Sequence, residues 1–267
     1  MTKISILGCG WLGMPLAKAL LQKEFLVNGS TTSPEKISSL ENLGINPFLI
    51  ALDGKSVSGA IESFLDESKI LIIDIPPKLR GNSPEDFVGK ITSLIPFIEK
   101  SSIENVLFVS STSVYGDDNT LITEETALNP DTEGGRQLAI AETLLQKNTC
   151  FKTTIVRFGG LIGEDRNPIK FLSGKENIEN PQAPINLIHQ EDCIGIILKI
   201  IANDCWNETF NAVTPFHPSR ENYYTQKAKE LNLALPKFNP ETNFTGKTIS
   251  SNKIETVLNY TFAKTNL

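Results

Sequence analysis

Three glycines near the start of the chain have the spacing of a nucleotide-binding turn. An apolar segment from Ile4 runs into Gly8-x-Gly10-x-x-Gly13, and an amphipathic helix pattern follows. In such a turn one glycine allows the tight bend, a second lets backbone approach a pyrophosphate, and a third allows the helix to pack closely on the strand. The helix N-terminus adds unpaired N–H groups for phosphate. The pattern predicts a dinucleotide site formed by Gly8, Gly10, Trp11, Leu12 and Gly13.

Hydroxyl residues stand where a fold specific for NAD places an acidic residue. That position, about 20 residues after the glycines, binds the ribose 2′-OH, and here it is Ser30-Thr-Thr-Ser33. Because no carboxylate repels a 2′-phosphate, we expect NADP(H) to be favoured over NAD(H), with contacts from Ser30, Thr31 and Thr32. The alternative is that the run only caps the next helix. Asp53, after the third predicted strand, is a candidate for the adenine edge or an ordinary turn residue.

The elements that must position these residues alternate along the first 163 residues. After the first strand, apolar runs at 25–29, 47–52, 70–75, 106–109 and 153–158 alternate with helix patterns at 34–43, 57–66, 84–100 and 134–147. This alternation predicts an α/β fold, a doubly wound parallel sheet of the Rossmann type with six strands. We expect residues 1–163 to form the NAD(P)-binding domain.

The second part of the chain, 164–267, is broken by prolines. It still contains helix patterns at 191–201 and 221–231 and a strand pattern at 209–213. We expect a smaller substrate-side subdomain here, with some segments returning to the sheet.

Composition limits the classes of partner. The 267 residues are 40% hydrophobic and carry a net charge of −6 without a basic stripe, which disfavours nucleic acid and membrane surfaces and favours a small-molecule substrate. The four cysteines, Cys9, Cys150, Cys193 and Cys205, are widely spaced, as expected of a reduced, cytoplasmic protein. No membrane span or leader is expected. The sequence leaves open whether the protein forms a homodimer.

A strand and the turn after it give the first resemblance to a known family. Val106-Leu-Phe-Val-Ser-Ser-Thr-Ser-Val-Tyr-Gly116 resembles the fifth strand of the extended short-chain dehydrogenase/reductase superfamily, which includes nucleotide-sugar epimerases and dehydratases. Further segments follow in that family's order: Glu124–Pro130, Ile155–Gly163, Asn186–Asp192 and Phe210–Val213. The resemblance implies an oxidoreductase or epimerase-like enzyme for a hydroxyl, carbonyl or sugar-derived compound. It also implies that Ser111 binds the substrate oxygen, with Thr112 and Ser113 beside it.

The acid/base pair of that family is missing from the chain. The family uses Tyr-x-x-x-Lys, but counting back from Glu142 places Gly134 and Leu138 at the two positions. Tyr115 is the candidate substitute if it faces the cleft, although it could also pack at the strand end. Arg136 is a candidate substrate contact at the start of the following helix. Because a positioned acid or base contributes roughly 10²–10⁴-fold to rate, a non-catalytic NADP(H)-binding sensor or regulator is the alternative function.

The fourth predicted strand ends in prolines instead of a glycine-rich turn. Proline has no N–H to donate, so Ile75, Pro76 and Pro77 are expected to line the cofactor cleft sterically and through carbonyls. The two histidines are not spaced as metal ligands, and we predict no metal site. Arg157 is expected to pair with a carboxylate. The glycine turn alone also resembles that of β-hydroxyacid and ketopantoate-type reductases, which lack the Ser-Ser-x-x-Val-Tyr-Gly segment.

Overall fold

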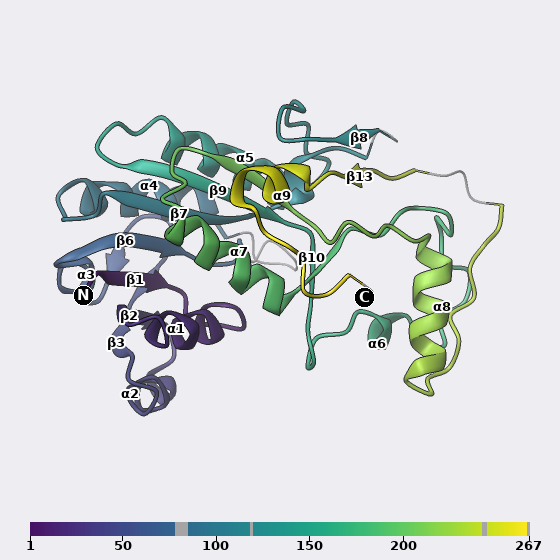
Figure 1. Ribbon diagram of the computed structural model, residues 1–267, viewed down its shortest axis with the longest axis horizontal. Coiled ribbons are helices and arrows are strands. Elements are labelled where there is room, and N and C mark those ends of the chain that lie inside the picture. Colours follow the sequence, from purple (N-terminus) through teal and green to yellow (C-terminus); the bar gives the residue numbers. More distant parts are fainter. Residues whose placement is uncertain (78–84, 118–119, 242–244, 266–267) are drawn as a thin grey trace.

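A parallel β-sheet forms the centre of the molecule (Figure 1). The computed structural model describes residues 1–77, 85–117, 120–241 and 245–265. Within these residues the sheet has seven strands in the order β12-β9-β7-β6-β1-β2-β3. Their bounds along the chain are β1 Lys3–Leu7, β2 Leu26–Thr31, β3 Asn46–Leu49, β6 Ser68–Ile73, β7 Asn105–Ser111, β9 Lys152–Phe158 and β12 Thr209–Ala212. The doubly wound Rossmann-type prediction is confirmed.

The strand order reverses between β1 and β6. The chain builds β1, β2 and β3 outward on one side, then returns through β6, β7 and β9 on the other. In such sheets ligands bind in the crevice outside the carboxyl ends of the strands at this switch point. The six predicted strands are present, and β12 extends the sheet beyond β9 in parallel register, from Thr209 opposite Ile155 to Ala212 opposite Phe158.

Helices cover both faces of the sheet. One face carries α1 (Gly13–Leu21), α7 (Gln190–Ala202) and α9 (Asn252–Leu258), and the other carries α3 (Ile61–Leu65), α4 (Phe87–Glu99) and α5 (Glu133–Gln146). Between β2 and β3 the chain forms a 3-10 turn, η1 (Pro34–Lys36), and the short helix α2 (Ile37–Glu41). No helix within the described ranges is long and apolar enough to cross a membrane.

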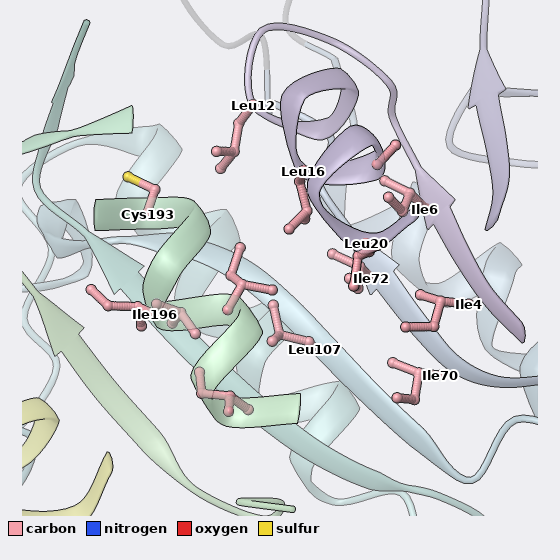
Figure 2. Packing of buried hydrophobic residues seen from close by; sticks show 14 of the residues in the cluster. Ile4, Ile6, Leu12, Leu16, Leu20, Ile70, Ile72, Leu107, Cys193 and Ile196 are labelled. Carbon is pink, nitrogen blue, oxygen red and sulfur yellow. The ribbon is translucent and has the colours of Figure 1, made fainter. Parts of the chain in front are cut away.

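Alternating side chains along each strand make the two halves of the core. Ile70 and Ile72 of β6 pack toward α1 and α7, whereas Leu71 and Ile73 pack toward α4 and α5. Figure 2 shows the first half, where Ile4, Ile6, Leu16, Leu20, Ile72, Leu107 and Ile196 meet between the sheet and the two helices. Strands buried on both faces explain the continuous apolar runs in the sequence.

The remaining elements lie beyond the carboxyl ends of the strands or in connections. The helices α6 (Ile169–Leu172) and α8 (Arg220–Glu230) pack in a third apolar cluster, at the right of Figure 1. The short strands pair as β10 (Gly160–Ile162) with β11 (Leu187–His189), β8 (Leu121–Ile122) with β13 (Thr248–Ile249), and β4 (Ala51–Leu52) with β5 (Val57–Ser58).

Two predicted helices differ in the structure. The segment 57–66 begins as the strand β5, because Val57 and Ser58 pair with Leu52 and Ala51, and only Ile61–Leu65 is helical. The segment 34–43 divides into η1 and α2, and the Ser33 side chain makes no capping hydrogen bond. In place of that cap, the Ser33 N–H donates to the Thr31 hydroxyl over 3.1 Å.

Candidate nucleotide site and adjoining hydroxyl cluster

The three glycines of the turn between β1 and α1 face different surroundings. A Cβ on Gly8 would lie 2.2 Å from the Asp74 carbonyl oxygen, and Gly8 also has a φ of +110°. A Cβ on Gly13 would lie 2.1 Å from the Gly8 carbonyl oxygen. A Cβ on Gly10 would meet nothing within 4 Å. Packing therefore requires glycine at Gly8 and Gly13, whereas Gly10 faces open space.

A cavity of about 180 Å³ opens beside this turn, at the carboxyl ends of β1, β2 and β6. We call it the β1–β2 cavity, and its lining is Leu7, Gly8, Cys9, Gly10, Ser30, Thr31, Thr32, Ser33, Lys36, Ile50, Leu52, Asp74, Ile75, Pro76 and Lys90. The predicted glycine turn, the hydroxyl run and part of the fourth strand's end thus meet at one place.

The hydroxyl run has an inner and an outer half. Ser30 and Thr31 are buried, and the Ser30 hydroxyl accepts a hydrogen bond of 2.9 Å from the Gly8 N–H. Thr32 is exposed and Ser33 is half-buried at the cavity rim. Ser30 therefore positions the glycine turn, and the outer pair is accessible to a ligand.

Two lysines line the same cavity. Lys36 is exposed at the end of η1, next to the hydroxyl run. Lys90 comes from α4, and its ammonium group forms an ion pair with Glu85. Only 12% of the Lys90 side chain is exposed. Lys90 was missed in the sequence because it lies 60 residues from the hydroxyl run, and only the packing of α4 brings it there.

Asp74 is a charged lining residue that, like Lys90, was not identified as a site residue from the sequence. It follows β6, whose carboxyl end adjoins that of β1. The Gly13 N–H donates a hydrogen bond to its carboxyl group, but burial dominates and raises its pKa to about 8. The adjacent Cys9 thiol is also buried, and burial followed by the Asp74 charge raises its pKa to about 12. Cys9 is accordingly an unreactive thiol at neutral pH.

Not every predicted cofactor contact lines the β1–β2 cavity. Ile75 and Pro76 line it, whereas Pro77 lies outside its lining. Asp53 is exposed, and its carboxylate accepts hydrogen bonds of 2.8 Å from the N–H groups of Lys55 and Ser56. Leu52 and Ile50 line the cavity near this turn. The adenine contact of Asp53 stays a prediction.

Trp11 points toward the turn that follows β10. Its indole N–H donates to Asp165 over 2.8 Å, and the Arg166 guanidinium lies 5.0 Å from the ring centroid. The Gln190 side chain donates to the Trp11 carbonyl oxygen over 2.7 Å. Leu12, by contrast, is buried in the core. Trp11 is therefore held against the Gly163–Arg166 turn, and its contact with the cofactor stays a prediction.

The hydroxyl cluster Ser111–Ser113 lies at the carboxyl end of β7. Ser111 is half-buried, and its hydroxyl accepts a hydrogen bond of 3.2 Å from the Ser113 N–H at the start of the 3-10 turn η2 (Thr112–Val114). Thr112 is buried, and a Cβ on Gly135 of α5 would lie 2.1 Å from the Ser113 carbonyl oxygen. The start of α5 thus packs directly on this cluster.

Arg136 lies on the exposed side of this helix start. Its guanidinium pairs with Glu133 over 2.9 Å, and about half of each side chain is exposed. Its substrate contact stays a prediction.

Of the two alternatives for Tyr115, the structure shows the one in which its side chain packs inward at the end of β7. Only 1% of Tyr115 is exposed, its hydroxyl donates to the Asn211 side-chain oxygen over 2.9 Å, and it accepts a hydrogen bond from Arg157. Burial raises the pKa of this phenol. Its side chain turns into the core because the two partners hold it there, so it is poorly placed to exchange a proton with a substrate.

The two residues that stand at the positions of the Tyr-x-x-x-Lys acid/base pair differ in burial. Leu138 is buried in the core on the inner side of α5, and Gly134 is half-buried near the helix start. Arg157 pairs with Glu142 over 2.6 Å, which confirms the predicted carboxylate partner.

The two histidines have local structural partners. The His189 ring accepts from the Glu191 N–H over 3.2 Å at the start of α7, and the His217 ring lies 3.0 Å from the Ile185 carbonyl oxygen. Over the described residues, no three His, Cys, Asp or Glu side chains form a group that could hold a metal ion.

Comparison with known proteins finds similarity to curated sequences over nearly the whole chain. No protein-family model matches the chain. The Escherichia coli (strain K12) protein YeeZ is 33% identical over 257 residues, covering 95% of this chain and 93% of that protein.

Several solved structures share the fold. A functionally unknown conserved protein from Silicibacter pomeroyi has a TM-score of 0.81 at 21% identity, covering 100% of this chain and 95% of the other. MoeE5 in complex with UDP-glucose and NAD has a TM-score of 0.80 at 18% identity, covering 99% and 94%. UDP-glucuronic acid 4-epimerase from Bacillus cereus in complex with NAD has a TM-score of 0.78 at 19% identity, covering 98% and 92%. These structures share the fold of this chain over nearly its whole length.

Proposed function

The chain belongs to the family of the Escherichia coli protein YeeZ, and from that premise we propose that it binds NAD(P) and is an atypical oxidoreductase. Its substrate in this proposal is a small hydroxyl, carbonyl or sugar-derived compound. The observation that carries the proposal is the open face of Gly10 in the β1–β2 cavity. Two solved structures of the same fold contain NAD by their descriptions, which supports a nicotinamide cofactor.

The cavity fits the adenosine half of a dinucleotide. Gly10 has no Cβ, and no protein atom lies within 4 Å of the place where one would be. A pyrophosphate can therefore approach the backbone here, beside the N-terminus of α1. The apolar side chains of Ile50, Leu52 and Ile75 provide surface for an adenine ring. When bound, the nicotinamide supplies hydride transfer.

A preference for NADP(H) is the finer part of the proposal. Thr32 and Ser33 offer hydroxyl groups at the cavity rim, and Lys36 and Lys90 line the same cavity. A 2′-phosphate carries about −1.5 to −2 charge at neutral pH, so the exposed Lys36 favours it over a 2′-hydroxyl, whereas Lys90 is already paired with Glu85. Among the described residues that line the cavity, those at the end of β2 include no acidic side chain.

The substrate would bind at the Ser111–Ser113 cluster. In this proposal the Ser111 hydroxyl, which accepts from the Ser113 N–H, donates its own proton to a substrate oxygen. The segment 164–267 would cover this end of the sheet as the substrate-side region. Arg136 would need to leave its exposed pair with Glu133 to reach an acidic substrate group.

One observation favours a second function. Tyr115 is buried and Leu138 is apolar and buried, so neither supplies an acid or base at the Ser111 hydroxyl. A protein that binds the cofactor but has no acid or base at either of these two positions would serve as a non-catalytic NADP(H)-binding sensor or regulator, the alternative that we retain.

The decisive test has two stages. Calorimetric titration of the purified protein with NADPH and with NADH should show saturable binding that is tighter for NADPH. Absence of binding by both would overturn the proposal. Reduced-cofactor oxidation is then followed with carbonyl and sugar-nucleotide substrates. Turnover that is lost in Ser111→Ala with unchanged cofactor affinity would support the enzyme, and binding with no turnover on any substrate would favour the sensor.

A further inference from the structure

Asp74 places a carboxyl group where the proposed phosphates would bind. It lines the β1–β2 cavity together with Gly8 and Gly10, and one carboxyl oxygen lies 3.1 Å from the position that a Gly13 Cβ would occupy. The same carboxyl group accepts the Gly13 N–H at the first turn of α1. An internal acidic group therefore occupies the helix end that, in this fold, commonly faces the pyrophosphate.

The groups around Asp74 do not neutralise it. Cys9 of the glycine turn and Cys193 of α7 are buried thiols whose pKa values are raised, in part by the Asp74 charge. Lys36 and Lys90 line the same cavity, but among the described residues neither forms an ion pair with Asp74, and Lys90 pairs with Glu85. Burial raises the pKa of Asp74 and outweighs the hydrogen bond from the Gly13 N–H, which lowers it. The ionised carboxylate thus has no cation at contact distance within the described residues.

We propose that nucleotide binding at this site is coupled to protonation of Asp74, so that the protein holds the cofactor with this side chain neutral. The inference rests on the proposed function, because it concerns the same cavity. Two adjacent anions, a carboxylate and a pyrophosphate, repel each other in a cavity screened from water. Protonation removes that repulsion.

The proton balance of the step is simple. In the free protein above the pKa of Asp74 the carboxyl group is ionised, and binding adds one proton from the buffer to a carboxylate oxygen. No electrons move. The neutral acid can still accept the Gly13 N–H through its carbonyl oxygen. Its new O–H group can donate to a phosphate oxygen, an interaction that the ionised form cannot make.

The first experiment measures the NADPH dissociation constant against pH. Over about pH 7 to pH 9 the 2′-phosphate of the cofactor stays largely ionised, because its second pKa is about 6. With a pKa of about 8 at Asp74, affinity should weaken about tenfold across this range if only the neutral form binds. Asp74→Asn, which is neutral and of the same shape, should bind tightly with a flat profile.

A matched control uses the same change at the other end of the same strand. Asp66 is exposed and precedes β6, so Asp66→Asn should keep the pH profile of the unaltered protein. A flat profile for the unaltered protein, or equal slopes for it and Asp74→Asn, would overturn the inference while leaving the proposed function intact.

The second experiment needs no variant and covers the case in which Asp74→Asn does not fold. Calorimetric titrations of the unaltered protein with NADPH near pH 8.5, in buffers of different ionisation enthalpy, count the protons taken up. Uptake that approaches one proton supports the inference, and zero uptake overturns it. Absence of NADPH binding at every pH would overturn the proposed function and this inference together.

Discussion

Arg157 and Glu142 form a buried ion pair that joins strand β9 to helix α5. The guanidinium Nη2 lies 2.6 Å from the Glu142 Oε2, and the side chains are 6% and 1% exposed. The Ser110 hydroxyl donates to the same carboxylate, and the Tyr115 hydroxyl accepts from the same guanidinium. This network occupies the inner face of α5, the helix that carries the acid/base pair in the resembled superfamily.

Breaking this pair should destabilise the fold. Arg157→Met leaves the Glu142 carboxylate buried without its cation, for which the expected loss in unfolding free energy is about 3–5 kcal/mol. Urea unfolding monitored by circular dichroism measures it. The double variant Arg157→Met/Glu142→Leu should recover part of that loss, because no unpaired charge remains buried.

An exposed pair provides the control. Lys237 and Glu176 lie 2.6 Å apart with 72% and 68% of their side chains exposed, so Lys237→Met should leave the unfolding midpoint nearly unchanged. Equal midpoints for Arg157→Met and Lys237→Met would contradict the stabilising role of the buried pair.

The sequence was sufficient for the sheet because its signals are local. Continuous apolar runs and the glycine turn marked β1, β2, β6, β7 and β9 and the start of α1, and the same runs lie buried on both faces of the sheet. Strand β12 was found as a strand, but its place beside β9 depends on pairing with residues about 54 positions earlier. No local pattern specifies such a pairing.

The site was less predictable because it depends on contacts between distant elements. The turn and hydroxyl run follow β1 and β2, so neighbouring strands bring them together. Lys90 reaches the cavity only through the packing of α4. Tyr115 was a candidate because it belongs to a motif at a strand end, but hydrogen bonds with Arg157 and Asn211 hold its side chain inward. A carboxylate at the end of the fourth strand, Asp74, could have been suspected from the Rossmann strand order.

Alanine at Gly10 and at Gly13 should separate binding from folding. At Gly13 the new Cβ would overlap the Gly8 carbonyl oxygen, and overpacking of this kind costs about 1–3 kcal/mol. At Gly10 the methyl group meets no protein atom within 4 Å. Gly10→Ala should therefore keep the unfolding midpoint but weaken NADPH binding by about tenfold or more, since backbone must approach the pyrophosphate there. Unchanged affinity in Gly10→Ala would contradict this assignment of the turn.

Replacing Lys36 should affect NADPH and spare NADH. Lys36→Gln removes a cation beside the hydroxyl run, and the NADPH affinity should fall about threefold to tenfold at low salt, with a smaller change at high salt. NADH affinity should not change. Lys23→Gln, an exposed lysine beyond the far end of α1, is the control. Equal losses for both cofactors would place Lys36 near the pyrophosphate or adenine instead of the 2′-phosphate.

Ser111 and Tyr115 should give different results in the substrate assay. Ser111→Ala should keep cofactor affinity and lower turnover about 10²-fold, because it removes a hydroxyl at the substrate. Tyr115→Phe should lower unfolding free energy by about 1–3 kcal/mol, since two buried partners lose a hydrogen bond. Its turnover per folded molecule should change little. Loss of turnover in a stably folded Tyr115→Phe would restore Tyr115 as the acid/base.

The stability of the free protein should report the titration of Asp74 without any ligand. The carboxyl group has a pKa of about 8 when folded, against about 3.9 in an unfolded chain. Between these values the folded state binds a proton that the unfolded state lacks, so this group makes stability fall as pH rises from about 4 to about 8. Asp74→Asn has no such titration.

Urea unfolding of both proteins near pH 5 and near pH 9 tests this expectation. From pH 5 to pH 9 the unfolding free energy of Asp74→Asn should rise by at least about 1 kcal/mol relative to that of the unaltered protein. Asp66 has an exposed carboxylate, so Asp66→Asn should follow the unaltered protein. Parallel pH profiles for Asp74→Asn and the unaltered protein would mean that Asp74 titrates alike in the folded and unfolded states. The carboxylate would then be ionised at neutral pH, beside the turn that is proposed to bind phosphate.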